Sequence, residues 1–258
     1  MLTLNQMNQY FPEPVVRRNP KGTLVEYLQY EILDSLFKNK EASKLGFIGG
    51  TAIRILHQSP RFSEDLDFDN FALSYRNFEV LLGKTCKDMK LKGFLIEYKM
   101  VQRGAYHCYI RFPSILYETG ISSNQEEKIL IRIDTELKKK HYQQSTFVLN
   151  GFSIYRKIMV APPSILLAQK MITVLQRKRE KGRDLFDVSF LCGIAKPDFS
   201  YVGKLLSLKK DKFLNLFRDR IDQLDLNFLA KDVEPFLFYP QQKERILTFK
   251  EYFGQLDL

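Results

Sequence analysis

Two aspartates separated by a single leucine follow a double glycine within residues 47–70, which read FIGGTAIRILHQSPRFSEDLDFDN. On a β-strand, Asp65 and Asp67 project from the same face while Leu66 points into the core. Two carboxylates about 5 Å apart repel each other by roughly 3 kcal/mol at an effective dielectric constant of about 20. A divalent cation removes this conflict, and a small number of hard oxygen ligands suits Mg²⁺, with Mn²⁺ as the alternative. The pair therefore predicts a metal site whose shell is completed by water and substrate phosphates.

The double glycine adds a backbone that can approach a ligand closely. Gly49 and Gly50 carry no side chain, and Thr51 begins a predicted helix whose N-terminus favours an anion. Each feature also has an ordinary structural interpretation, the glycines as a plain turn and the aspartates as solvated charge or a helix cap. At this spacing, the glycines, the helix and the aspartates together predict a site for a nucleoside triphosphate.

Short helices and strands must position these residues, and hydrophobic periodicity identifies them. Thr23 is the expected cap of the first helix, and Asn150 with Gly151 is the expected turn of the last hairpin. Apolar residues alternate along 128–137, which places Asp134 on the more polar face of that strand. The expected elements are helices over residues 23–39, 51–58 and 74–92, strands over residues 45–48, 65–68 and 128–137, and hairpins over residues 93–112 and 146–160.

The pattern of residue types changes at the sequence APPS, residues 161–164. Pro162 and Pro163 cannot continue a central strand, Ser164 can cap a helix, and almost all later residues follow helical spacing. We therefore predict an α+β protein. Its N-terminal domain, residues 1–161, contains a mixed sheet, and its helical C-terminal domain, residues 162–258, completes the cleft.

Composition limits the class of protein. Of the 258 residues, 40 are Lys or Arg and 30 are Asp or Glu, and the net charge of +10 favours phosphates, RNA or an acidic partner, with simple solubility as the alternative. The three separated cysteines form no CxxC pair, which favours reduced thiols and a cytoplasmic location. No secretion signal is recognisable, and no stretch reaches the roughly 18 apolar residues of a membrane span, so we expect no membrane partner. The three histidines lack a spacing suited to zinc.

Two segments of the chain resemble a known family. Residues 49–68, GGTAIRILHQSPRFSEDLDF, resemble the pattern GGTAL followed by R-x-S-x-D-L-D-F of the AbiEii/AbiGii toxin-like nucleotidyltransferases, in the DNA polymerase β-like nucleotidyltransferase superfamily. Ile53 replaces the usual leucine. Residues 166–191 resemble the family's segment of a lysine, a downstream arginine and R-D-x-x-D, and the likeness extends over residues 20–195. The matching residues are Gly49, Gly50, Thr51, Ala52, Arg61, Ser63, Asp65, Leu66, Asp67, Phe68, Lys170, Arg177, Arg183, Asp184 and Asp187.

The resemblance implies a polymerase β-like N-terminal domain that transfers a nucleoside monophosphate from an NTP to an acceptor hydroxyl. The acceptor is RNA, with tRNA as a candidate, or protein, and a cognate antitoxin is an expected partner. In the two-metal scheme of this chemistry, Asp65 and Asp67 contact both ions. A neighbouring strand supplies a third carboxylate, for which Asp134 is the candidate. A pairing of Asp134 with Arg132 or a lysine is the alternative, and Glu136 on the same face competes for the role.

The resemblance also implies contacts with the nucleotide elsewhere in the chain. Lys170 and Arg177 are seven residues apart, so they share a helix face and could grip phosphates, with a solvated basic helix as the alternative. We expect Lys170→Ala to weaken NTP use with folding intact. Asp184 matches a family aspartate near the nucleotide, and we include it among the catalytic candidates. Arg61 either contacts phosphate or braces the loop before the aspartates.

Three functions compete on these observations. The first is a Mg²⁺-dependent nucleotidyltransferase of the toxin type. The second is a nucleotidyltransferase on the same scaffold that modifies a small molecule, as antibiotic-modifying relatives do. The third is a nucleotide-binding interaction protein with little catalysis, and the intact motif of Asp65, Leu66 and Asp67 argues against it.

Overall fold

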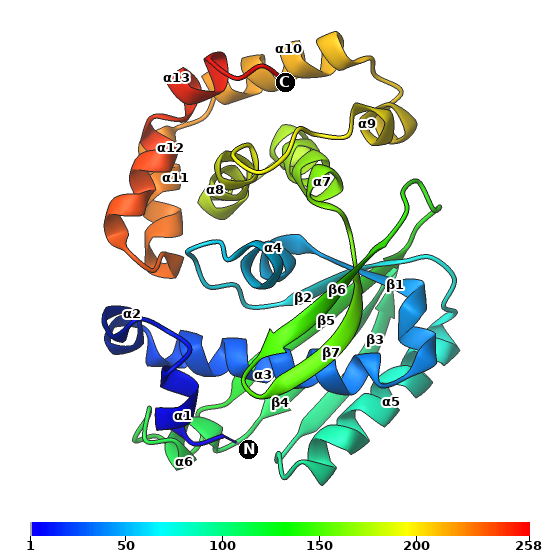
Figure 1. Cartoon of the computed structure of the whole chain (residues 1–258), viewed down its shortest axis with the longest axis vertical. Helices are drawn as coiled ribbons and strands as arrows, with labels where there is room; N and C mark the ends of the chain where they lie inside the picture. Colours follow the sequence, from blue (N-terminus) through cyan, green and yellow to red (C-terminus); the bar gives the residue numbers. More distant parts are fainter. Residues whose placement is uncertain (1) are drawn as a thin grey trace. The chain divides into compact units, whose positions relative to one another are not determined.

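The computed structural model describes residues 2–258, which fold into two compact units (Figure 1). Unit 1 consists of residues 2–52, 62–139 and 144–160 and contains the whole β-sheet. Unit 2 contains the helices that follow residue 160, together with the earlier segments 53–61 and 140–143. The division into domains of residues 1–161 and 162–258 stays a prediction.

Seven strands of unit 1 form one mixed sheet. They are β1 (Leu45–Ile48), β2 (Leu66–Asn70), β3 (Glu97–Arg103), β4 (Ala105–Phe112), β5 (Ile129–Leu137), β6 (Ser145–Gly151) and β7 (Ile154–Val160). Their order is β3-β4-β5-β2-β1-β7-β6. The central strand β2 runs antiparallel to β1 and parallel to β5, and β1 runs parallel to β7. This sheet, with its flanking helices, confirms the predicted α+β class.

Two long helices of unit 1, α3 (Pro20–Phe37) and α5 (Tyr75–Leu91), pack against each other and against the sheet (Figure 1). α3 contacts β5, β6 and β7, whereas α5 contacts β3 and β4. Alternate residues of β5 are buried, namely Ile129, Ile131, Ile133 and Thr135. The predicted alternation is therefore confirmed, and Asp134 projects from the opposite face. The shorter helices of this unit are α1 (Leu4–Asn8), α2 (Glu13–Arg18), η1 (Lys40–Lys44) and α6 (Ile115–Glu118).

The first turn of α3 differs from the prediction. The helix begins at Pro20, and the side chain of Asn19 caps it by accepting a hydrogen bond from the Gly22 N–H at 2.7 Å. Thr23 lies inside the helix and donates its hydroxyl to the Pro20 carbonyl at 2.8 Å, so the capping role predicted for Thr23 is wrong. Proline favours this earlier start because its φ is already helical and it has no N–H to leave unpaired.

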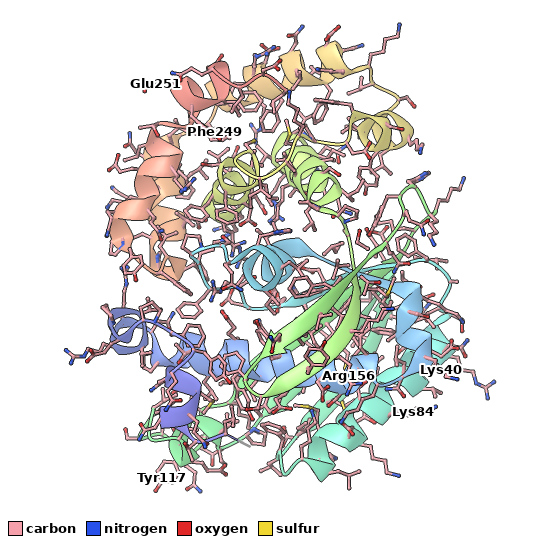
Figure 2. All side chains as sticks on the ribbon, in the orientation of Figure 1. Lys40, Lys84, Tyr117, Arg156, Phe249 and Glu251 are labelled. Carbon is pink, nitrogen blue, oxygen red and sulfur yellow. The ribbon has the colours of Figure 1, made fainter. Side chains whose placement is uncertain are left out.

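Ion pairs fasten α3 to β7 and to the end of α5. Asp34 accepts hydrogen bonds from Arg156 and Lys92, each at 2.8 Å, and Lys92 also binds Glu31 at 2.6 Å (Figure 2 labels Arg156). Burial alone would raise the pKa of Asp34, but hydrogen bonds from Lys92 and Arg156 bring it below its ordinary value. These contacts satisfy the charges of buried carboxylates on the helix face that packs against the sheet.

The hairpin between β6 and β7 turns two residues later than predicted. Phe152 and Ser153 occupy the turn, with φ of +53° and +62°, and Gly151 pairs with Ile154 inside the ladder. The Phe152 side chain is only 3% exposed, and four aromatic rings surround it, those of Tyr10, Phe11, Tyr27 and Tyr30. Burial of this ring outweighs the local preference of Asn150 and Gly151 for the turn position.

Gly151 is needed for close packing in this hairpin. A Cβ atom added there would lie 2.9 Å from Cε1 of Tyr30. We therefore expect Gly151→Ala to lower the free energy of unfolding by about 1 to 3 kcal/mol, as overpacking does. Gly83→Ala is the matched control, because a Cβ there would meet no atom closer than 3.8 Å and alanine favours the helix in which it lies. Urea unfolding measures both variants, and a Gly151→Ala protein as stable as the wild type would contradict the packing argument.

Unit 2 is built from helices. They are α7 (Pro163–Gln176), α8 (Gly182–Leu191), α9 (Phe199–Leu206), α10 (Lys210–Asp222), α11 (Leu226–Val233), α12 (Glu244–Leu247) and α13 (Phe249–Gly254), with the 3₁₀ turns η2 (Glu234–Phe236) and η3 (Pro240–Lys243). α7 follows Pro162 directly, so Ser164 lies in its first turn and is not the predicted cap. Buried aromatic rings of α10 and α13 pack together, among them Phe217 and Phe253 at 5.1 Å between centroids. Across residues 2–258, no helix has both the length and the apolar composition needed to cross a membrane.

Candidate functional site

Three aspartates gather at the middle of the sheet in unit 1, and we call Asp65, Asp67 and Asp134 the acidic cluster. Asp67 on β2 is the register partner of Asp134 on the parallel strand β5, so their side chains leave the same face of the sheet. Asp65 directly precedes β2 and thus lies outside the strand on which the sequence placed it. The sheet register brings the two predicted strands side by side and sets the third carboxylate opposite the central one.

Arg132 lies among these carboxylates. It precedes Asp134 by two residues on β5, so its side chain leaves the same face. One terminal nitrogen of its guanidinium donates to Asp65 Oδ2 at 2.9 Å, and Nε lies 2.7 Å from Asp134 Oδ2 without the alignment of a hydrogen bond. The other oxygen of Asp134, Oδ1, lies 2.7 Å from Nδ1 of His107 on β4. The alternative pairing of Asp134 with Arg132 is therefore present in the structure, and His107 is a neighbour that sequence reasoning missed.

The charges of the cluster act on each other. Burial raises the pKa of Asp65, and this effect exceeds the opposing one of the Arg132 charge, so the pKa stays above its ordinary value. Burial alone would lower the pKa of Arg132, but the charges of the three aspartates raise it overall. The charge of Arg132 thus interacts with those of all three carboxylates. A cation close to carboxylates favours their charged form.

The double glycine lies against the acidic cluster, as the sequence predicts. Gly49 begins helix α4 (Gly49–His57) with φ of +80°, and a Cβ atom added there would collide with the carboxylate of Asp67. The hydroxyl of Thr51 donates to the backbone carbonyl of Asp65. β1 and β2 are antiparallel with Ile48 opposite Asp67, which sets the start of the helix beside the carboxylates. Backbone N–H groups at this helix start can bind an anion next to Asp67.

Gly49 offers a direct test of this close approach. We expect Gly49→Ala to lower the free energy of unfolding by about 1 to 3 kcal/mol more than Gly104→Ala does. Both glycines have positive φ, +80° and +70°, so both variants carry backbone strain. Only Gly49 has neighbouring atoms within 4 Å of an added Cβ, and these belong to Asp67. If urea unfolding gives the same decrease in free energy of unfolding for both variants, the Asp67 carboxylate moves aside without a cost in stability.

The donor chemistry of the acidic cluster fits a hard divalent cation, because carboxylate oxygens are the ligands that Mg²⁺ prefers. In the part of the chain that the structure describes, however, no three acidic, histidine or cysteine side chains are arranged as around a metal ion. Arg132 contacts oxygens of both Asp65 and Asp134.

A second set of charged residues lies in unit 2, and we call Arg61, Lys170, Arg177, Asp184 and Asp187 the ion network. Arg61 donates to both oxygens of Asp187, at 2.7 and 2.5 Å, and both side chains are at most 1% exposed. Lys170 lies 2.8 Å from Asp184 and 2.8 Å from Asp187. Arg177 lies 3.1 Å from Asp184. Residues far apart in the sequence thus satisfy each other's charge.

The ion network bears on the predicted nucleotide contacts. Lys170 and Arg177 both reach Asp184. Arg177 follows the last residue of α7 with an extended backbone, so the prediction that the two residues share a helix face is wrong. A small pocket of about 10 Å³ lies beside Arg177 and Asp184. Arg61 braces its loop through Asp187. Because Lys170 is 14% exposed between two carboxylates, we expect Lys170→Ala to lower stability, contrary to the expectation from sequence.

Asp184 gives the fold a dependence on pH. Burial alone would raise the pKa of its carboxyl, but the charges of Lys170, Arg177 and Arg61 bring it below its ordinary value. Such a carboxyl stabilises the fold above its unfolded pKa of about 3.9, and this stabilisation is lost as the pH falls through the lower folded pKa. We expect the free energy of unfolding to fall more steeply below about pH 4 in the wild type than in Asp184→Asn. The free energy of unfolding of both proteins is measured by urea unfolding at a series of pH values. The same dependence on pH in the two proteins would contradict this prediction.

Comparison with known proteins places the chain among nucleotidyltransferases. The family described as nucleotidyl transferase AbiEii toxin, type IV TA system, matches residues 31–256. The structure is similar to that of MenT4, the nucleotidyltransferase toxin Rv2826c from Mycobacterium tuberculosis H37Rv, with a TM-score of 0.62 and 16% identity over 100% of this chain and 91% of that one. It is also similar to JHP933 from Helicobacter pylori, with a TM-score of 0.56 and 18% identity over 91% and 90% of the two chains. A comparison with curated protein sequences gave no match.

Proposed function

The chain belongs to the AbiEii family of nucleotidyltransferase toxins of type IV toxin–antitoxin systems, and on that premise we propose the metal, the acceptor and the residues of its reaction. Family membership makes it an enzyme that transfers a nucleotidyl group from an NTP. The proposed metal is Mg²⁺, which Mn²⁺ can replace. The proposed acceptor is a hydroxyl of RNA, because the net charge of +10 favours a partner rich in phosphates.

One observation carries the assignment of the site. Asp67 is the register partner of Asp134, and the same carboxylate lies against Gly49 at the N-terminus of α4. A place for metal-bound phosphate oxygens and a place for phosphate at a helix N-terminus therefore meet at one residue. In this proposal, Asp65, Asp67 and Asp134 hold the metal, while Gly49, Gly50 and Thr51 supply the backbone that faces the triphosphate.

The reaction breaks one phosphoanhydride bond. The oxygen of the acceptor hydroxyl attacks the α-phosphorus of the NTP, a new phosphodiester forms, and pyrophosphate leaves. Mg²⁺, when bound, neutralises the charge that develops on the phosphates. The proton of the hydroxyl passes to the carboxylate of Asp134, and His107 at 2.7 Å from its Oδ1 orients that carboxylate.

The residues of unit 2 have separate roles in the proposal. Arg61 and Lys170 act first through the fold of unit 2, since both are held by buried carboxylates. Arg177 is the candidate for direct phosphate contact, because 42% of its side chain is exposed and it contacts Asp184 only through Nε, at 3.1 Å from Oδ2. Asp184 is held by Lys170 in the ion network, and its role near the nucleotide stays a prediction.

The acceptor can be identified by following the label. Purified protein is incubated with Mg²⁺, each of the four α-labelled NTPs in turn, and total tRNA, bulk protein or a small-molecule extract. We expect label in RNA with one NTP strongly preferred. Label in protein would replace the RNA proposal, and label in a small molecule would support the antibiotic-type alternative. Nucleotide binding without transfer to any acceptor would favour the interaction protein.

The partner can be tested in cells. A type IV system pairs the toxin with an antitoxin, and we propose that this chain acts in the cytoplasm, where its NTP and RNA substrates are present. Expression of the chain alone should arrest growth, and co-expression of a neighbouring gene should relieve the arrest. If a variant that lacks transferase activity still arrests growth, the toxicity does not depend on the proposed reaction.

A further inference from the structure

We propose that Arg132 is an exchangeable counter-cation of the acidic cluster, which holds Asp65 and Asp134 in the metal-free chain and releases them when a divalent cation binds. This inference rests on the proposed function, because it concerns the metal of that same site. It assigns a role to a residue that does not belong to the matching motifs. The role is one of positioning, since the guanidinium acts through the carboxylates.

Arg132 occupies the oxygens that a metal would need. Its guanidinium contacts Oδ2 of Asp65 at 2.9 Å and Oδ2 of Asp134 at 2.7 Å, so it bridges two of the three carboxylates. Mg²⁺ takes up carboxylate oxygens at about 2.0 to 2.1 Å. A guanidinium and a metal ion on the same two oxygens would repel each other at close range. Binding of the metal therefore requires these two contacts to open.

The contacts of Arg132 are suited to opening. Its side chain is 42% exposed, and its Nε has no aligned hydrogen-bond partner although an oxygen of Asp134 is 2.7 Å away. Its backbone N–H meets Asp65 only at 3.4 Å. Arg61 in the ion network shows the opposite case, with two hydrogen bonds to one carboxylate and 1% exposure. The pair of Arg61 and Asp187 is thus fixed by burial, whereas the contacts of Arg132 can exchange.

The carboxylates need a counter-charge in either state. Without a counter-charge, the negative side chains of Asp65 and Asp134 would repel each other and move apart. Arg132 prevents this, because it keeps the oxygens of Asp65 and Asp134 within reach of a common cation. When the metal replaces it, the ligand positions are already formed.

Direct metal binding tests this inference without reference to activity. Mn²⁺ is titrated into the full chain in the absence of nucleotide, with free Mn²⁺ followed by electron paramagnetic resonance. We expect Arg132→Met to bind Mn²⁺ about tenfold more tightly than the wild type, the size expected when competing, partly exposed ion pairs are removed. In EDTA the same variant should melt at a lower temperature than the wild type. Addition of Mn²⁺ should raise the melting temperature of the variant more than that of the wild type.

A matched control lies on the neighbouring strand. Arg111 on β4 is the register partner of Leu130, so it projects from the same sheet face as Arg132. Arg111→Met removes an equal charge from that face and should leave the Mn²⁺ affinity close to the wild-type value. If Arg132→Met does not fold, Arg132→Gln keeps a polar donor at this position but carries no charge, and it should also bind Mn²⁺ more tightly than the wild type.

The outcomes separate the inference from the function on which it rests. Equal or weaker Mn²⁺ binding by Arg132→Met, with the metal still bound by both proteins, would overturn the exchange and leave the proposed metal site intact. Absence of Mn²⁺ binding in every variant would overturn both. If Arg111→Met gains as much Mn²⁺ affinity as Arg132→Met, the gain comes from the lower net charge of the sheet face. This result would also overturn the exchange.

Discussion

The Asp67→Asn variant should lose nucleotidyl transfer by a factor on the order of 10³ while its fold stays intact. Asparagine has the shape of aspartate, so the strand and the approach of Gly49 to residue 67 are preserved. The amide lacks the negative charge that balances the metal and loses one oxygen ligand. Asp67 faces both Asp134 and the start of α4, so no other carboxylate of the cluster can take its position. The measurement is the initial rate of label transfer from the preferred NTP.

Glu136→Gln is the matched control for this loss. Glu136 lies two residues after Asp134 on the same face of β5, and it was the competing candidate for the third carboxylate. Its side chain is 59% exposed and bound to Lys138 at 2.6 Å. We expect Glu136→Gln to keep near wild-type activity and Asp134→Asn to lose most of it. A transferase that remains active as Asp67→Asn would remove the acidic cluster from the reaction.

Local sequence signals predicted most of the elements around the acidic cluster. β5 is the clearest case, because its alternation gives the buried face and the polar face directly and leaves Asp134 outward. The short strand β1, the glycines and the start of α4 were also predicted, since residue types and spacing determine them within a few positions. These features depend on neighbours in sequence, which explains why the pattern was sufficient.

Features that depend on register were not accessible in this way. The contacts of Arg132 and His107 with Asp134 require that β4, β5 and β2 be neighbours in one particular alignment, which no local pattern specifies. The turn at Phe152 is a similar case, because rings from the turn after α1 and from α3 hold that side chain and override a local turn signal. Likewise, Arg61 reaches Asp187 over a separation of 126 residues.

The partners of Arg61 lead to the second large expected effect. Arg61→Met should lower the free energy of unfolding by about 3 to 5 kcal/mol, the range measured when one partner of a buried ion pair is removed. Methionine fills much of the same volume, so the loss comes mainly from Asp187, whose carboxylate is 0% exposed and would keep only Lys170 as its cation. The measurement is urea unfolding at neutral pH.

A double variant separates this charge effect from packing. When Asp187→Leu is combined with Arg61→Met, no buried carboxylate is left without its arginine, and the pair as a whole contributes far less than the loss of one partner costs. We expect the double variant to be more stable than Arg61→Met alone, with Lys170 then held by Asp184. Lys196→Met is the control, because its pair with Asp257 is fully exposed at the aspartate and its removal should change little. A double variant no more stable than Arg61→Met would show that the shape of the guanidinium, and not its charge, holds this part of unit 2.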